Sequence, residues 1–462
     1  MPYSDKDVFE RATFKPLQRI LDSDKVRKLE SRLKIRRRGD SDTEDFEITE
    51  KQHLEESIWQ PDIVAAIDGS KHEVPVENGF PSAEYGYITV ASVLIFLNKI
   101  RELEKQEFIN PVDFRKTEEH STTESAIPGC NIIVDDEESA KSSMRKVLFE
   151  DLLIEAPFYD LNENNKETLF QTYEYLLKIK LDKGANTNAP KCPVEDCEKD
   201  FSYGFGTYEC KCEKKKTLFS SDALRLHELH NDGGSCGEMY GQIMFTLERL
   251  WLVHILRGFE RTQNLDVLRK LAFIIDGSLA VFSTPSWLAK PIEDELVRIN
   301  QLQKEINGQD LIILGIEKGG QFVNHFEALD TDREGFAGKI PNQSAILLTD
   351  KYIKKNIKLS DSPKPYGQDT YFGRKFFYKT NNGYRVTANV AVFNDYQKGL
   401  ETAYPNQFPR LADVMSLLDQ VVSSRFQNSV SPLLSAHAEA SIPLNLGKRI
   451  FQDIAREIRS RS

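Results

Sequence analysis

The feature that most constrains this chain is a pair of matching segments, residues 65–70 (AAIDGS) and 273–278 (FIIDGS), which lie far apart in the sequence. Each is an apolar run, typical of a buried strand, that delivers an aspartate, Asp68 or Asp276, followed by glycine and serine. One Asp-Gly pair alone is usually a hairpin turn, because both residues tolerate positive φ. Two copies after apolar strands make it equally reasonable that the two carboxylates lie on one sheet and converge on a hard cation.

Strand-like and helix-like patterns alternate around these two segments, with β-branched runs separated by amphipathic stretches. We expect strands at 62–67, 85–97, 270–275, 310–316, 344–348, 371–378 and 384–393, with 279–282 as a continuation or hairpin partner of 270–275. We expect helices at 16–35, 138–154, 166–183, 237–261, 291–306, 410–425 and 446–459. The pattern predicts an α/β or α+β fold with a mixed sheet and helices packed on it.

The length of 462 residues exceeds what one hydrophobic core usually holds, so we expect two to three structural units or one large domain with insertions. We predict an N-terminal helical arm and linker (1–58), a first core part (59–100), an insertion (101–235) and a second core part (236–462). The charge-dense linker contains Arg36, Arg37 and Arg38, which are either solvated or in contact with a partner.

The net charge of −11 argues against a protein that coats nucleic acid by bulk attraction, so any contact with phosphate must be local. Four basic residues are candidates for such contacts, although each also fits an ordinary surface charge: Lys318, Arg374, Lys375 and Arg385. The sequence shows no apolar stretch of membrane-spanning length and no leader-like start. We therefore expect a cytoplasmic protein that does not enter a membrane.

Two further residue types complete a possible metal site. Glu248 lies inside an otherwise apolar helix, where a carboxylate is costly unless it pairs with an arginine or binds a metal ion. Glu260, at the end of the same helix, is the weaker alternative because its surroundings are polar. His437, in a small-residue segment that can pack closely on a sheet, is either structural or a ligand and proton shuttle. Such a set suits Mn²⁺ or Mg²⁺, which prefer oxygen ligands.

A cysteine segment stands out within the predicted insertion, at residues 190–214. Four of the six cysteines fall there, as Cys192, Cys197, Cys210 and Cys212. Disulfides are uncommon inside cells, so two short cysteine pairs favour a structural zinc site with four thiolate ligands, with free thiols as the alternative. Three neighbouring residues are near enough to replace one of these ligands: His227, His230 and Cys236.

Taken together, these segments resemble the NurA nuclease family. The resemblance rests on Ile67-Asp68-Gly69-Ser70, on residues 275–279 (IDGSL), on residues 244–248 (MFTLE) and on the Ala436-His437 segment, in the family's order. It implies an RNase H-like core related to PIWI domains, cutting of DNA with manganese, and Asp68, Glu248, Asp276 and His437 as the metal-binding catalytic set. Lys318 would correspond to a family lysine near the scissile phosphate.

The family resemblance also implies partners and a pathway. These are a HerA-type hexameric ATPase, a homodimeric state, and a role in DNA end processing or phage defence. We look for docking of the motor on the Leu-rich arm. Two other functions stay open: a catalytically silent adaptor of such an ATPase, and an RNase H-like nuclease that acts on RNA, since the same metal chemistry cuts both backbones.

Overall fold

The computed structural model describes residues 15–33, 46–76, 80–103, 105, 116–154, 167–184, 190–195, 197, 199–331, 338–423 and 429–441. Contacts divide the chain into two compact units, Met1–Asp45 and Phe46–Ser462. The described part of the first unit holds two short helices, α1 (Lys15–Leu21) and α2 (Asp24–Glu30). Ser23 caps α2 by accepting a hydrogen bond from the backbone N–H of Val26.

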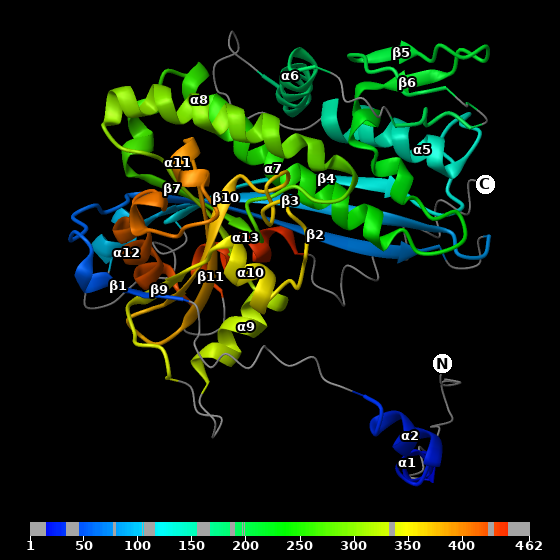
Figure 1. Ribbon diagram of the computed structural model, residues 1–462. Coiled ribbons are helices and arrows are strands. Elements are labelled where there is room, and N and C mark those ends of the chain that lie inside the picture. Colours follow the sequence, from blue (N-terminus) through cyan, green and yellow to red (C-terminus); the bar gives the residue numbers. More distant parts are fainter. Residues whose placement is uncertain are drawn as a thin grey trace. The chain divides into compact units, whose positions relative to one another are not determined.

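A nine-stranded mixed sheet forms the centre of the second unit, in the order β1-β9-β10-β11-β8-β7-β2-β3-β4 (Figure 1). Its strands are β1 (Ile48–Glu50), β2 (Ile63–Pro75), β3 (Glu84–Phe96), β4 (Glu118–Pro128), β7 (Leu271–Asp276), β8 (Ile312–Glu317), β9 (Ser344–Leu347), β10 (Gly373–Lys379) and β11 (Arg385–Ala391). The pairs β2–β7 and β7–β8 are parallel, and the other neighbours are antiparallel. The predicted mixed α/β architecture is confirmed.

The central strands are apolar on both faces because helices cover both. In β2, Ala65 and Ile67 belong to one buried cluster, while Val64 and Ala66 belong to another on the opposite face. This alternation is the period of two that a strand imposes. The residue after Ile67, Asp68, therefore faces the second cluster.

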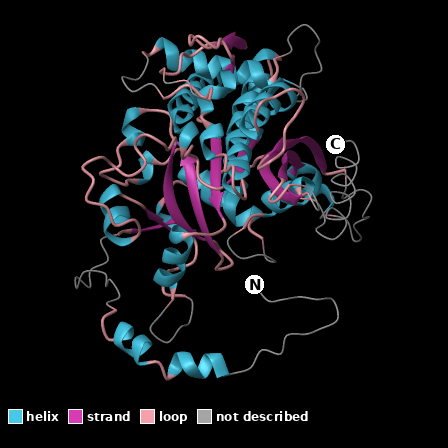
Figure 2. Ribbon diagram, turned by 90° about the vertical axis from the view of Figure 1, so that its right-hand side faces the viewer, coloured by secondary structure: helices cyan, strands magenta, loops and turns pink. Residues whose placement is uncertain are grey.

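Two helical layers enclose the sheet. One contains α6 (Leu169–Asp182), α7 (Gly237–Arg261) and α8 (Ala289–Asn307), which Figure 1 shows stacked on one another; in Figure 2 these cyan helices gather on one side of the magenta strands. The other contains α12 (Leu411–Val421) and α13 (Ser431–Ala440). The helix α13 packs on β2 and β3, opposite α7. The carboxylates of β2 thus lie between two helices.

The remaining elements are short. The helices are α3 (Leu97–Leu103), α5 (Ala140–Val147), α9 (Gln321–Asp330), α10 (Asp350–Asn356), α11 (Asp395–Lys398) and a π-helical turn, η2 (Leu148–Ile154). The 3₁₀ turns are η1 (Lys51–His53), η4 (Ser220–Leu224), η5 (Leu226–Leu229), η6 (Leu265–Lys270), η7 (Thr284–Leu288) and η8 (Pro405–Gln407). A separate hairpin pairs β5 (Thr207–Glu209) with β6 (Thr217–Phe219). Within the described residues, no helix has the length and apolar character that crossing a membrane requires.

Several predictions differ from the structure at the edges of the sheet. The polar segment Glu118–Pro128, expected within an insertion, is strand β4 and pairs with β3 over its whole length. Its polar residues fit because β4 is an edge strand and most of its residues are exposed or half-buried. The predicted arm (1–58) includes β1, which pairs with β9. Residues 279–282 form only an isolated bridge, Ala280 with Tyr371, instead of a strand. The predicted helix 446–459 and the arginines at 36–38 lie outside the described residues.

Candidate metal centre

Asp68 and Asp276 lie side by side on neighbouring parallel strands. Ile67 of β2 is in register with Ile275 of β7, so the two aspartates follow at the same level of the sheet. Asp276 is the last residue of β7, as predicted, but β2 does not end at Asp68 and continues to Pro75. Its long antiparallel pairing with β3 carries it past the site. Asp68 is therefore held in a central strand and is 1% exposed.

The two glycines that follow these aspartates have different roles. Gly69 stays in β2, and a Cβ there would lie 2.5 Å from Cγ of Met244 and 2.8 Å from Oε1 of Glu248. Gly277 has a φ of 76° and lets the chain leave β7. The hairpin-turn interpretation is thus wrong at Asp68, where glycine instead allows close approach of α7 and its glutamate to the strand.

Glu248 is buried within α7, and its side chain is completely enclosed. Burial raises the pKa of this carboxyl to about 8; Arg249 opposes the shift, while Asp68 and Asp276 add to it. Oε2 of Glu248 pairs with the Arg249 guanidinium, whereas Oε1 is buried with no hydrogen-bond partner. The carboxylate therefore keeps one oxygen for a further ligand, which is the condition that a metal ligand must meet.

Arg249 also connects this helix to the end of β7. Its Nη2 donates to the backbone oxygens of Asp276 and Ser278, at 2.9 Å each. The guanidinium thus holds the turn after Asp276 in place through the main chain. From the sequence this arginine was recognisable only as a possible partner of Glu248.

Lys318 lies between the two aspartates. Its Nζ is 2.8 Å from Oδ2 of Asp68 and 3.1 Å from Oδ1 of Asp276. Burial lowers the pKa of Lys318, but the two carboxylates outweigh it and the net shift is upward. The ordinary surface-lysine interpretation is therefore wrong, since this ammonium neutralises the centre of the site.

His437, on α13, approaches the same carboxylate from the other side of the sheet from α7. Its Nδ1 is 3.4 Å from Oδ2 of Asp68, and the imidazole is about half exposed, at 54%. The hydrogen bond with Asp68 raises the pKa of His437. A histidine in contact with both a buried aspartate and solvent is well placed to bind a cation or to exchange a proton.

A third carboxylate, not singled out from the sequence, ends the next parallel strand. Glu317 closes β8 and accepts hydrogen bonds from Ser278 Oγ at 2.6 Å and Asn389 Nδ2 at 3.1 Å. The ammonium of Lys375 also contacts it. The same signal that marked Asp276 was present here, because residues 312–316 are an apolar strand followed directly by an acidic residue.

The donor set suits a hard divalent cation. Asp68, Asp276 and Glu248 offer carboxylate oxygens, one of them unpartnered, and His437 offers a ring nitrogen. The ammonium of Lys318 lies between Asp68 and Asp276 and balances part of their negative charge. Within the described part of the chain, these four side chains are not drawn together as tightly as the cysteines below, whose ligand atoms lie within 4.8 Å of one another. Asp68 and Asp276, which now contact Lys318, would be among the residues that hold a cation.

The other residues considered from the sequence lie elsewhere. Glu260 pairs with Arg298, with Oε–Nη distances of 2.8 and 2.6 Å. Arg374 is 2% exposed and donates to backbone oxygens of three residues: Gln397, Gly399 and Thr402. Lys375 is 4% exposed. The expectation that Arg374 and Lys375 are surface cations is wrong, because backbone oxygens of residues 397–402 cover Arg374 and Glu317 pairs with Lys375.

The last basic candidate, Arg385, is also engaged within the protein. It pairs with Glu327 and Asp330, and 15% of its side chain is exposed. Of the four basic candidates, Lys318 is the one that contacts both Asp68 and Asp276, while Lys375 pairs with Glu317.

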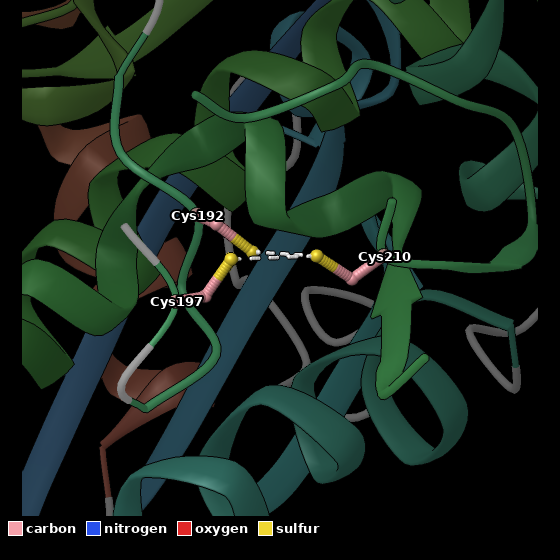
Figure 3. A group of neighbouring side chains, drawn as sticks. All are labelled: Cys192, Cys197 and Cys210. Carbon is pink, nitrogen blue, oxygen red and sulfur yellow. Dashed lines mark hydrogen bonds between the residues drawn. The ribbon is translucent and has the colours of Figure 1, made fainter. Parts of the chain in front are cut away.

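The cysteine segment gathers three thiols (Figure 3). Sγ of Cys210 lies 3.3 Å from Sγ of Cys192 and 3.6 Å from that of Cys197, too far for disulfides. The backbone N–H of Cys212 donates to the Cys210 sulfur at 3.4 Å, and a hydrogen bond with Cys210 lowers the pKa of the Cys212 thiol to about 7. His227 instead lies near Asp222, and His230 pairs with Asp232. The predicted four cysteines thus supply three converging sulfurs and a fourth beside them.

Fold and site together define a class: a mixed-sheet α/β protein whose adjacent parallel strands carry aspartates into one acidic, lysine-bridged centre. Within this class the chain belongs to the NurA family, because the NurA domain matches residues 62–441. That range includes all four members of the predicted catalytic set. The family resemblance inferred from the sequence is confirmed.

Comparisons with individual proteins are distant. No curated protein matches the chain. Among solved structures it is similar to the NurA nuclease from Sulfolobus solfataricus, at 11% identity and a TM-score of 0.33 over 97% of each chain. It is also similar to a NurA structure at 11% and 0.21 over 94% and 95%, and to NurA with manganese at 10% and 0.19 over 93% of each.

Proposed function

We propose that the chain is a metal-dependent nuclease that hydrolyses phosphodiester bonds of DNA. The observation that carries the proposal is the pair Asp68 and Asp276 on adjacent parallel strands, backed by a buried glutamate with an unpartnered oxygen. Asp68, Asp276, Glu248 and His437 would hold Mn²⁺ or Mg²⁺. When bound, such a cation supplies a reactive water at neutral pH and neutralises charge that develops on the phosphate.

The protein's own groups have distinct tasks in this proposal. Lys318, whose ammonium contacts both aspartates, would donate a hydrogen bond to a non-bridging oxygen of the scissile phosphate. His437 would either complete the ligand set of the cation or exchange a proton with solvent through its half-exposed ring. Arg249 keeps the main chain after Asp276 fixed, so that this carboxylate keeps its direction.

We further propose that the core is RNase H-like. Support comes from one half of the sheet, β4-β3-β2-β7-β8, where an antiparallel meander is followed by two parallel strands. The helix α7 connects the meander side to β7 and brings Glu248 to the aspartates. The proposed site is thus formed by adjacent positions on β2 and β7 and by the helix α7, which precedes β7 in the chain.

For the cysteine segment we propose a structural zinc ion held by Cys192, Cys197, Cys210 and Cys212. The support is the gathering of three sulfurs and the lowered pKa of the Cys212 thiol, since zinc binds thiolates. Metal analysis of purified protein tests this. We expect one zinc per chain, reduced in Cys192→Ser with a fall in melting temperature; a zinc-free, equally stable wild type would contradict it.

As partners we propose a HerA-type hexameric ATPase and a second copy of the chain, acting in DNA end processing or phage defence. The N-terminal unit supports a docking role, because its two helices and the residues that follow α2 expose a series of apolar side chains: Leu17, Ile20, Leu21, Leu29 and Leu33. A chain lacking residues 1–45 should retain hydrolysis but lose co-purification with the ATPase. Retained co-purification would place the docking surface elsewhere.

The proposed activity is tested by hydrolysis of labelled single- and double-stranded DNA with Mn²⁺, Mg²⁺ or EDTA, with and without a HerA-type partner. Wild-type protein should cut with a divalent metal, and Asp276→Asn should not. The exposed Asp266, on η6, provides a matched Asp266→Asn control that should keep full activity. Silence of the wild type under every condition would favour an adaptor, and preference for a labelled RNA strand would favour an RNA nuclease.

A further inference from the structure

A second recess, away from the carboxylates, combines basic and aromatic side chains. It encloses about 540 Å³ and lies where α6, the cysteine segment, η7 and the start of α8 meet. Its lining includes four basic residues, Lys180, Lys183, Arg225 and Lys290. Two acidic residues, Glu293 and Asp369, also line it. In a chain with a net charge of −11, such a local excess of positive charge marks a place suited to an anion.

Three of these four cations are already paired. Lys183 pairs with Asp294, Lys290 with Glu293 and Asp294, and Arg225 with Glu228 through two hydrogen bonds. Lys180 is different, because no carboxylate pairs with it in the part of the chain that the structure describes. Burial lowers its pKa, and the neighbouring Arg225 lowers it further.

Lys180 instead lies between two aromatic rings. Its Nζ is 4.7 Å from the ring centre of Trp287 and 5.4 Å from that of Tyr203. Trp287 is anchored by its own N–H, which donates to the backbone oxygen of Ala223 at 2.7 Å. A cation beside fixed aromatic rings is the combination that proteins use to bind single-stranded nucleic acid, where phosphates meet basic groups and bases meet rings.

The recess adjoins a second hollow that reaches the catalytic strands. This hollow encloses about 520 Å³, and its lining includes Glu317, Lys375, Thr370 and Tyr371. Thr370 and Tyr371 also line the recess at Lys180. Glu317 directly precedes Lys318, which bridges Asp68 and Asp276. The recess at Lys180 therefore shares Thr370 and Tyr371 with a hollow that is lined by the last residue of β8, which is next in sequence to Lys318.

We infer that this recess is a second binding site for a single polynucleotide strand, with Lys180 contacting a backbone phosphate several nucleotides from the bond that is cut. The inference rests on the proposed nuclease function and adds a task for the segment 190–203, whose Pro190 and Tyr203 form one wall. The cysteine segment would then shape part of the strand path. Ribose and deoxyribose backbones share the phosphate chemistry used here.

The test measures binding without cutting, by fluorescence anisotropy of labelled oligothymidylate in the Asp276→Asn background. Lys180→Gln should weaken binding of a strand of about 15 nucleotides roughly threefold to tenfold and lower the salt slope by about one. A strand of about 3 nucleotides should be unaffected, because it does not span both sites. Lys178→Gln, an exposed lysine on the same helix, is the matched control and should change neither.

Lys180→Arg should restore most of the affinity, and oligouridylate should show whether ribose is also accepted. Equal effects of Lys180→Gln on short and long strands, or none on either, would overturn the inference, as would binding of an acidic peptide in place of both polynucleotides. Cutting of the short strand by otherwise wild-type protein is measured in parallel. If the short strand is cut but Lys180→Gln binds the long strand as tightly as the unsubstituted protein does, then the proposed second site has failed while the proposed nuclease function stands.

Discussion

The helix α7 carries two glutamates whose surroundings are opposite in kind. Glu248 is fully enclosed beside Asp68 and Asp276, has one unpartnered oxygen, and has its pKa raised to about 8 by burial. Glu260, near the end of the helix, accepts two hydrogen bonds from Arg298, which lower its pKa. On one helix, Glu248 thus pairs with a guanidinium through one oxygen and keeps the other unpartnered, whereas both oxygens of Glu260 accept from Arg298.

The compensated region is a wider network. Arg257 donates to Glu167 at 2.7 Å and to Glu295 at 2.5 Å, and Arg298 links Glu295 to Glu260. Here each buried carboxylate has guanidinium partners, so the network joins α6, α7 and α8. Buried charge without such partners costs stability, and proteins retain it mainly where function needs it. The contrast distinguishes structural acids from candidate ligands.

The largest expected difference is in activity. Glu248→Gln should lower the rate of DNA hydrolysis by about two to three orders of magnitude, because a neutral amide is a poor ligand for a divalent cation. Glu260→Gln is the matched substitution on the same helix and should stay within about twofold. Initial rates with Mn²⁺ on labelled DNA measure both; comparable losses in the two variants would remove the distinction.

A substitution in the Arg257 network should affect the stability of the protein more than its activity. Arg257→Met removes the shared partner of Glu167 and Glu295, so that Arg261 is left as the guanidinium partner of Glu167 and Arg298 as that of Glu295. We expect the free energy of unfolding to fall by about 3 kcal/mol. Urea titration followed by circular dichroism measures this, and activity per folded molecule should be retained. A loss under about 1 kcal/mol would show that the network is dispensable.

The two regions should also differ in the sign of their pH dependence. The folded-state pKa of Glu248, about 8, lies above its ordinary value of 4.5, so the fold favours the protonated form. Metal-free wild type should therefore lose stability as pH rises from 4.5 through 8. Glu248→Gln cannot ionise and should exceed wild type by about 2 kcal/mol at alkaline pH. Unfolding in EDTA across this range checks it; a variant less stable at every pH would contradict the assignment.

The smallest expected effect is at Glu260. Its pKa is lowered in the folded protein, so its stabilisation is present above the unfolded-state value near 4.5 and is lost as pH falls through the lowered value. Glu260→Gln should cost about 0.5–1 kcal/mol at neutral pH, because the pair is partly exposed. Thermal melts of both proteins at neutral and acidic pH measure the difference. A cost that persists unchanged in acid would point to packing instead of charge.

Much of the central architecture was predictable from sequence, since the apolar runs at β2, β7 and β8 and the long helix α7 have strong local patterns. The edge strand β4 was not predictable. Its sequence is polar at nearly every position, so it lacks the alternation of apolar and polar residues by which a strand is recognised. The buried state of Arg374 was equally unpredictable, because its Nη1 and Nη2 donate to backbone oxygens 23 to 28 residues further along the chain. Local pattern does not contain such partners.

The site divides in the same way. The sequence by itself determined the two Asp-Gly-Ser segments, the buried Glu248 and the clustered cysteines, because each is a local departure from an apolar or ordinary background. Only the tertiary structure decided that the absence of a side chain at Gly69 lets Glu248 lie close to β2. It also decided that Lys318 contacts both aspartates and that Glu260 pairs with Arg298. The physical reason is that the charge around a carboxylate is set by groups from other elements, which chain folding alone brings within reach.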